Sequence, residues 1–232
     1  MKYTIHPLGD SAVLIDFQEA DSKDTLNTIT ALTQALAENQ HEAVLEAVPA
    51  YKTVTVHYNP LKIHSHLPYV IIKDFLLDKI EGLQPDEDSL TNEVITIPVL
   101  YGDEAGPDLS LVAEHNNLTE EKVIELHSEP VYSVAFLGFS PGFPFLKGMD
   151  SSIAVPRRKT PRVRIDAGSV GIAGYQTGVY PISSPGGWQI IGKTPLKLFD
   201  PDNRNQPALL SQGDKVRFSS ITKAEYERLE GS

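Results

Sequence analysis

Residues 138–195 constrain the fold of this chain more than any other stretch. Glycine and proline are interleaved there with aromatic residues, β-branched residues and four arginines. Glycine adopts backbone angles that other residues avoid, and proline fixes φ and lacks a backbone donor. A disordered low-complexity segment would lack the phenylalanine, isoleucine, valine and tryptophan found here. The stretch therefore predicts ordered loops and short strands that carry a binding site.

The charge of the chain is unevenly distributed. A net charge of −11 argues against general nucleic-acid binding. Within residues 128–195, seven Lys or Arg stand against three acidic residues, which gives +4 there and leaves −15 for the remainder. Such a basic island indicates either an anionic ligand or partner, or a solvated surface loop.

Length and composition narrow the class of protein. The chain has 232 residues, which suits one large or two small domains, and 41% of them are hydrophobic, enough for real cores. No run of about 18 apolar residues occurs, so we expect no membrane span, and the first residues lack the features of a signal peptide. The absence of cysteine excludes disulfides and thiol catalysis and fits a cytoplasmic protein.

Strand and helix signals alternate along the first 90 residues. Apolar periodicity predicts strands at 13–17, 44–48 and 53–58 and helices at 21–38 and 67–83. This order is typical of an α+β sandwich, with the helices on one face of an antiparallel sheet. The polar, acidic segment 84–92 is interpreted as a linker, so we expect an N-terminal domain at 1–90 and a second domain at 91–232.

From residue 94 onward, short strands are separated by turn residues. A strand is predicted at 94–99, where Pro98 suggests an edge position. Helices are predicted at 107–115 and at 120–127, the second one capped by Thr119. Further strands are predicted at 131–137, 169–173, 178–182, 188–191, 196–199 and 215–219, and a final helix at 223–229. This pattern fits a compact β-barrel.

Residues 187–194 match the literal phosphate-loop pattern, but their context argues against one. A phosphate loop needs small residues that wrap the phosphate and a helix that follows. Here Trp188 and the isoleucines fill the loop, and Pro195 follows at once. We therefore interpret this segment as a strand.

Two other motifs are also incomplete. Ala167 replaces the first glycine of a serine-hydrolase elbow, which leaves Ser169 as a structural hydroxyl or a ligand donor. His64 and His66 could pair on a metal, but no carboxylate cluster accompanies them. A solvated turn is the better interpretation, and no metal site is predicted.

His127 lies at a predicted helix end, shortly before the strand that leads into residues 138–145. An imidazole there could act as acid, base or ligand donor near neutral pH. The alternative is a C-terminal histidine that interacts with the helix dipole. Residue type alone favours this structural alternative.

Arginine and neutral polar residues predict a concave site for a small anionic ligand. Arg157 and Arg162 flank Pro161, and arginine forks bind carboxylate or phosphate through two hydrogen bonds. Gln176, Thr177 and Tyr180 add neutral donors and acceptors on the next turn.

Four aromatic residues form either a hydrophobic core or a wall beside that site: Phe139, Phe143, Phe145 and Trp188. Core is the safer interpretation for most of them. Gly142 lies between Pro141 and Phe143. This order predicts a rigid turn that presents at least one ring outward.

Several long irregular strings carry a resemblance to a known family. They are GFSPGFPFL at 138–146, the Pro-Arg pairs at 156–157 and 161–162, GSVGIAG at 168–174, QTGVYP at 176–181 and PGGWQ at 185–189. LGDSA at 8–12, YGD at 101–103 and GPDL at 106–109 extend the match across the chain. The sequence resembles the KipI/PxpB family, also labelled allophanate hydrolase subunit 1, of the carboxyltransferase subdomain C/D type.

The resemblance implies an N-terminal α+β domain followed by a cyclophilin-like β-barrel. It also implies the B subunit of an ATP-dependent 5-oxoprolinase, which opens 5-oxo-L-proline to L-glutamate and is inactive alone. The partners would be a KipA/PxpC-type subunit and a LamB/YcsF-type PxpA subunit, with ATP and Mg needed by the complex rather than assigned to this chain. The alternative is a KipI-type inhibitor of the autophosphorylation of a sensor histidine kinase.

From the residues and the resemblance together we expect two sets of site residues. The catalytic set is His127, Arg157 and Arg162. The ligand-binding set is Phe139, Pro141, Gly142, Phe143, Ser169, Gln176, Tyr180, Gly186, Gly187, Trp188 and Gln189. Two departures, Asp166 in place of the family's proline and Lys147 in place of its glycine, affect the expected shape of the loops beside the site.

Overall fold

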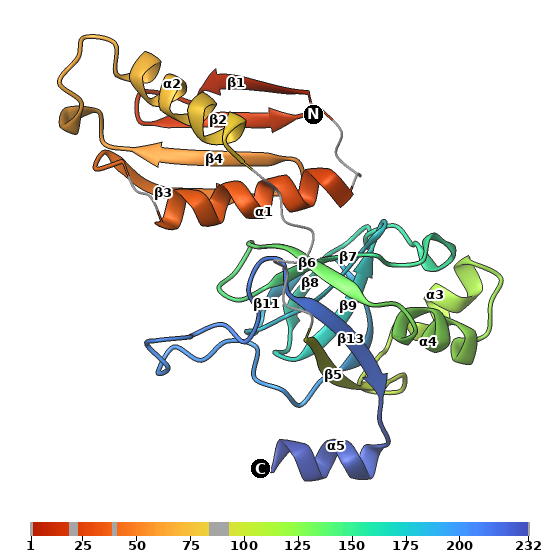
Figure 1. Cartoon of the computed structure of the whole chain (residues 1–232). Helices are drawn as coiled ribbons and strands as arrows, with labels where there is room; N and C mark the ends of the chain where they lie inside the picture. The colour runs from red at the N-terminus through yellow and green to blue at the C-terminus, as the bar shows by residue number, and fades with distance from the viewer. Residues whose placement is uncertain (1, 19–22, 39–40, 84–92, 232) are drawn as a thin grey trace. The chain divides into compact units, whose positions relative to one another are not determined.

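The computed structural model describes residues 2–18, 23–38, 41–83 and 93–231 (Figure 1). The chain divides into two compact units, Met1–Leu90 and Thr91–Ser232. The linker predicted at 84–92 lies outside the described residues. No helix within the described ranges is long and apolar enough to cross a membrane.

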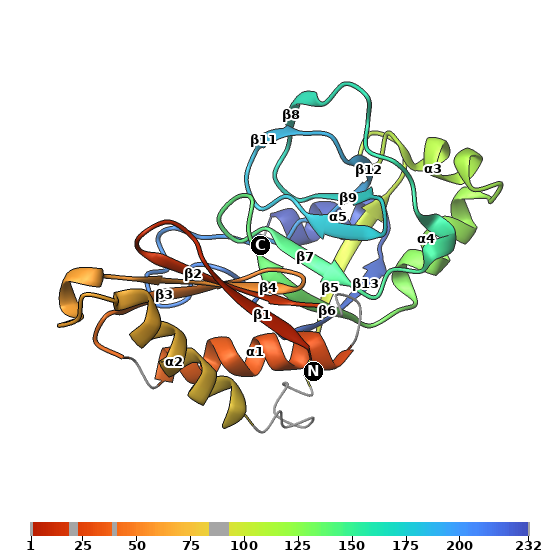
Figure 2. The ribbon, with the colours of Figure 1, turned by 90° about the horizontal axis from the view of Figure 1, so that it is seen from above.

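The N-terminal unit is a four-stranded antiparallel sheet with two helices on one face (Figure 2). The strands follow the order β1-β2-β4-β3. Their bounds are β1 (Tyr3–Pro7), β2 (Ala12–Phe17), β3 (Val44–Pro49) and β4 (Thr53–Tyr58), and the helices are α1 (Lys23–Glu38), α2 (Pro68–Glu81) and the short 3-10 turn η1 (Pro60–Lys62). This is the predicted α+β sandwich, with β1 as an additional edge strand.

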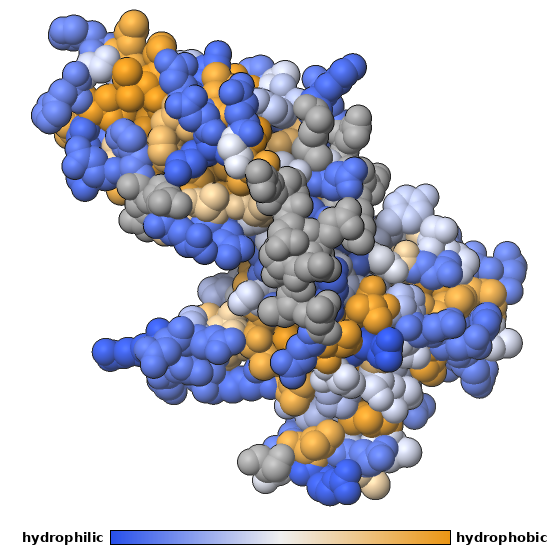
Figure 3. Space-filling view, viewed as in Figure 1, coloured by the Kyte–Doolittle hydropathy of each residue, from blue (hydrophilic) through white to orange (hydrophobic). Residues whose placement is uncertain are grey.

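Alternation along β2 and β4 builds the core of this unit. Every second side chain of these strands is buried, and Ile15 pairs with Val54 across the ladder. The helices close the core with Ile29, Leu32 and Leu76, among others. Apolar surface remains around the start of α2 (Figure 3), where Leu67, Val70 and Ile71 are exposed.

The C-terminal unit is a closed seven-stranded barrel in the order β10-β7-β6-β13-β5-β12-β9. The pairs are antiparallel except for β13 with β5. The barrel strands are β5 (Val94–Tyr101), β6 (Tyr132–Leu137), β7 (Pro144–Lys147), β9 (Ser169–Ala173), β10 (Gln176–Val179), β12 (Gln189–Lys193) and β13 (Lys215–Ser220). The predicted barrel is therefore confirmed, and closure leaves its strands without an open edge.

Smaller elements surround the barrel. A two-stranded sheet of β8 (Arg162–Ile165) and β11 (Ser184–Gly186) lies outside it (Figure 2). Helices α3 (Leu109–His115) and α4 (Glu120–Ser128) pack side by side, α3 against β12 and α4 against β13. The remaining elements are the 3-10 turn η2 (Ser151–Ile153) and α5 (Lys223–Glu230).

Two strand predictions for the barrel need correction. Pro98 does not mark an edge, because β5 lies between β13 and β12. Its missing donor is tolerated because β12 pairs only with Leu100 and Tyr101. The strand predicted at 196–199 is also wrong, because this segment forms only a single bridge, between Phe199 and Ala208.

Candidate functional site

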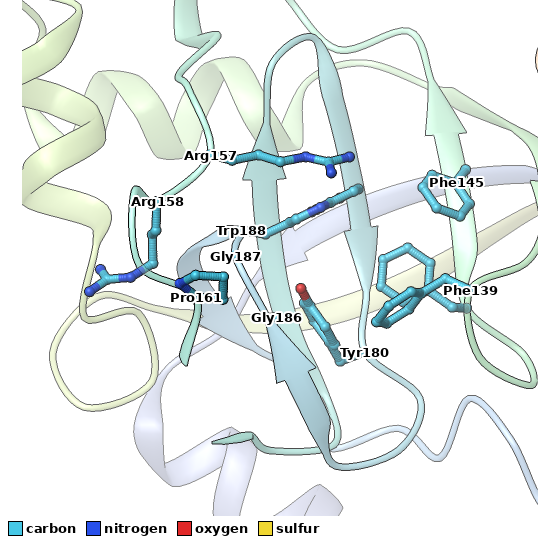
Figure 4. A pocket seen from close by; sticks show the side chains of 10 residues that line it. Phe139, Phe145, Arg157, Arg158, Pro161, Tyr180, Gly186, Gly187 and Trp188 are labelled. Atoms are coloured by element: carbon cyan, nitrogen blue, oxygen red, sulfur yellow. The ribbon is translucent and has the colours of Figure 1, made fainter. Parts of the chain in front are cut away.

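Aromatic rings line a cavity of about 200 Å³ in the C-terminal unit (Figure 4). The rings belong to Phe139, Phe143, Phe145, Tyr180 and Trp188, and the remaining walls come from Arg157, Arg158, Pro161, Gly186 and Gly187. Phe143 packs edge to face on Tyr180 at 5.2 Å and on Trp188 at 5.4 Å between ring centroids. Such pairs hold aromatic walls in fixed positions.

A tight turn supplies one side of this cavity. Gly142 has φ +77°, and a Cβ there would meet Phe199 Cβ at 3.0 Å. Phe139 has φ +70°, which is strained for a bulky residue, and its side chain is 65% exposed. It is the outward-facing ring that the sequence predicts, whereas Phe143 is buried.

Gly186 and Gly187 form the opposite wall. A Cβ on Gly186 would overlap the Tyr180 hydroxyl group, so only glycine allows this close approach. Burial raises the pKa of Tyr180, and a hydrogen bond from the Trp188 backbone and the charges of Arg157 and Arg162 oppose that shift. The hydroxyl is neutral near pH 7 and can donate a hydrogen bond.

Asp108 organises the arginine segment. Its buried carboxylate accepts hydrogen bonds from Arg162 Nη1 at 2.8 Å and Nη2 at 2.9 Å, and from Arg158 Nη1 at 2.9 Å. The backbone N–H of Ile190 donates a further bond at 2.7 Å. The guanidinium fork of Arg162, which we expected to hold a ligand anion, therefore holds Asp108.

Arg157 differs from these two arginines. It is exposed and has no hydrogen bond or ion pair to the part of the chain that the structure describes. In Figure 4 its side chain extends on the side of the aromatic rings, whereas Arg158 points away from them. Arg157 is thus the arginine of this segment that remains available to an anion at the cavity.

His127 lies in the barrel core and not at the cavity. It is fully buried and stacks on Phe218 with ring centroids 4.4 Å apart. Tyr101 Oη lies 2.8 Å from Nδ1, and Nε2 lies 2.8 Å from Thr177 Oγ1. Because Thr177 Oγ1 donates its proton to Gly171 O, Nε2 must donate to Thr177, and Nδ1 accepts from Tyr101.

Burial lowers the pKa of His127 to about 3, so the imidazole is neutral. Both ring nitrogens are already paired within the chain, and water has no access. The geometry argues against the acid/base role expected for this residue and favours a structural one.

The other expected ligand residues are not all brought to the cavity. Ser169 is buried at the start of β9, where it pairs in register with Lys193, and Gln176 begins β10. Pro141 lies in the turn beside Phe139, and Gln189 lies behind the arginine segment, with Nε2 donating to Pro156 O at 3.1 Å. None of these four lines the aromatic cavity.

The structure also bears on the phosphate-loop match, on metal binding and on the two departures from the family pattern. The segment at 187–194 forms strand β12 and no helix follows it, so the phosphate-loop interpretation fails as predicted. Within the described ranges, no group of three or more His, Cys, Asp or Glu side chains could hold a metal ion. Asp166 pairs with Arg164 at the surface, and Lys147 ends β7.

Sequence reasoning missed Asp108 and Arg158 as members of this region. Asp108 had a signal, because it lies in the string GPDL that contributed to the resemblance. Gly106 of the same string approaches Ile191 O so closely that a Cβ would overlap it. The string thus marks where the start of α3 is held against β12.

The fold and the site define a class: a two-unit α+β protein with a cyclophilin-like barrel that carries an aromatic cavity edged by arginine. The family described as "Carboxyltransferase domain, subdomain C and D" matches residues 3–210. The chain belongs to this family and, within it, to the KipI/PxpB proteins that its sequence resembles.

Named relatives match almost the full chain. The B subunit of 5-oxoprolinase from Bacillus subtilis (strain 168) is 44% identical, over 97% of this chain and 96% of the relative. The B subunit of 5-oxoprolinase from Escherichia coli O157:H7 is 43% identical, over 91% of this chain and 93% of the relative. Among solved structures, TTHA0988 is 36% identical with a TM-score of 0.79, over 91% of this chain but only 40% of that longer chain.

Proposed function

We propose that this chain is the B subunit of an ATP-dependent 5-oxoprolinase, which converts 5-oxo-L-proline to L-glutamate. The observation that carries the proposal is the match, nearly end to end in both directions, to two relatives with that subunit name. Those relatives favour this function over inhibition of a histidine kinase. They also support a role in a hydrolase complex, because a protein named as a subunit acts with others.

The proposed reaction explains the need for ATP. A lactam is a stable amide, so transfer of the γ-phosphoryl group of ATP to the lactam oxygen, with release of ADP, would activate its carbonyl carbon. Water would then attack that carbon and the C–N bond would break, which leaves an acyl phosphate on the opened chain. A second water would hydrolyse this acyl phosphate to the carboxylate, with release of phosphate. The amine nitrogen would take up a proton, and L-glutamate would result. Because the reaction uses ATP, it would take place in the cytoplasm.

We assign this chain a binding role in that reaction. The aromatic cavity would hold the small ring, and Arg157 would pair with its carboxylate. The Tyr180 hydroxyl would donate to a ligand oxygen. Since the described residues offer neither a phosphate loop nor a group of metal-binding side chains, Mg·ATP would bind at the level of the complex.

The partners would be a KipA/PxpC-type subunit and a LamB/YcsF-type PxpA subunit. The structural match to a longer protein supports a shared site, because the homologous region there makes up 40% of one continuous chain. The exposed, strained Phe139 at the rim of the cavity is a suitable contact for such a partner.

The test is reconstitution of the full chain with the two partner subunits, measuring 5-oxoproline-dependent ATP hydrolysis. We expect hydrolysis only when this chain is present, and normal hydrolysis without it would refute the proposal. Arg157→Ala should lower kcat/KM by about tenfold or more, the usual worth of a hydrogen bond to a charged group. Arg164→Ala is the matched control, because Arg164 is an exposed arginine outside the cavity, and it should leave turnover unchanged.

A further inference from the structure

A second cavity lies behind the arginine segment. It has a volume of about 430 Å³, and its walls come from α3, from residues 155–160 and from Gln189 of β12. It shares Arg157 and Arg158 with the aromatic cavity, so the arginine segment separates the two. The function proposed above leaves this second cavity unused.

The second cavity is cationic. Arg157, Arg158 and Lys159 all line it, and no carboxylate is among its lining residues. Arg158 Nη1 is paired with Asp108, whereas neither Arg157 nor Lys159 has an ion pair to the described part of the chain. The exposed Thr160 adds a hydroxyl group. This lining favours an anion.

Two buried polar atoms beside this cavity have no hydrogen-bond partner among the described residues. Gln189 is 5% exposed and directs Nε2 to Pro156 O, which leaves Oε1 as a buried, unpaired acceptor. Arg158 Nε is a buried, unpaired donor. Buried polar atoms in folded proteins are almost always paired, so a molecule that supplies both missing partners would be bound specifically.

We propose that this cavity binds a phosphate that carries a proton, as inorganic phosphate does near pH 7. The anionic oxygens would accept from Arg158 Nε, Lys159 and Thr160, and the P–OH group would donate to Gln189 Oε1. A physiological link to the phosphate released from an activated lactam rests on the proposed function, but the binding itself does not.

The experiment compares oxyanions on the isolated full chain at pH 7, by calorimetry and by backbone amide NMR. Inorganic phosphate and arsenate are the probes that carry a proton, and sulfate is the matched anion that carries none. We expect phosphate and arsenate to bind at least about tenfold more tightly than sulfate, because sulfate would leave the Gln189 acceptor unpaired. The amide shifts should be confined to α3, residues 155–160 and β12.

Two variants sharpen this test. Gln189→Leu should lower phosphate affinity to that of sulfate, and Lys159→Ala should weaken both anions about fivefold or more, whereas Arg164→Ala should change neither. Equal binding of phosphate and sulfate by the unmodified chain, no binding of phosphate, or equal losses for Lys159→Ala and Arg164→Ala would overturn the proposal. The comparison of anions on the unmodified chain decides the outcome even if Gln189→Leu fails to fold.

Discussion

The C-terminal unit contains two polar clusters that differ in whether they can still bind a ligand. In the core cluster, His127 is paired on both ring nitrogens, and Tyr132 Oη donates to the His127 carbonyl at 2.8 Å. In the arginine cluster, Asp108 occupies Arg162 and one nitrogen of Arg158, while Arg157 stays unpaired within the described residues. The first cluster has no capacity left for a ligand, and the second does.

The difference shows that hydrogen-bond pairing, more than residue type, separates a structural polar group from a functional one. Burying a neutral histidine costs little free energy when both ring nitrogens have partners in the chain, and these hydrogen bonds hold neighbouring elements in place. An exposed arginine beside a rigid aromatic wall retains its donors for an incoming anion. Three experiments test this difference.

The largest effect should come from Asp108→Ala. Removing the carboxylate leaves Arg162, Arg158 and the Ile190 N–H without their shared acceptor, so the free energy of unfolding should fall by about 3 kcal/mol. Asp166→Ala removes an exposed ion pair to Arg164 and should cost less than about 0.5 kcal/mol. Urea unfolding of both variants measures this, and equal losses would contradict an organising role for Asp108.

The second effect is a pH dependence from the core cluster. The pKa of His127 is about 3 in the folded chain and about 6.5 when unfolded, so between these values the unfolded state binds more protons. The stabilising contribution is complete above the unfolded pKa and is lost as pH falls toward the folded pKa. From about pH 7 to about pH 5, His127 should therefore account for a loss of about 2 kcal/mol.

The control for this pH dependence is a pair of histidine variants. His127→Gln should flatten the pH profile of unfolding by that amount, and by more than His115→Gln, which replaces an exposed histidine at the end of α3. The same profile in the unmodified chain and in His127→Gln would show that the core imidazole does not set it.

The smallest effect concerns the strained ring at the edge of the aromatic cavity. Phe139→Gly should be more stable than Phe139→Ala by about 1 kcal/mol, because only glycine relieves the positive φ of this position. Both variants should lower turnover in the reconstituted complex. Thermal unfolding ranks the two, and a more stable alanine variant would show that the position is not strained.

Much of the fold was predictable, because burial imposes a period on the sequence. Alternation identified β2, β4 and β13, and the cap at Thr119 was predicted and forms with Lys122 N–H at 3.2 Å. The strands that were missed, β1, β7, β8 and β11, are only three to five residues long, too short for a period to appear. The wrong strand at 196–199 arose because Leu198 packs into the barrel core without strand pairing.

The residue types of the candidate site were predictable from the sequence, but their hydrogen bonds and ion pairs were not. The turn around Gly142 and the aromatic residues near it were recognised because glycine and proline restrict the backbone locally. His127 was expected near the site because it precedes the 138–145 turn in sequence. Its ring instead stacks on Phe218 of β13, a strand that is distant in sequence.

Local backbone limits and periodic burial made the two-part α+β and barrel architecture and the rigid glycine-proline turns predictable from the sequence, and its long irregular strings carried the family resemblance. Which arginine is available to a ligand depends on the tertiary fold. Asp108 meets Arg158 and Arg162 across 50 and 54 residues of chain, and Ile190 across 82. An ion pair forms between side chains that are close in space, and the closed barrel brings these distant parts of the chain together.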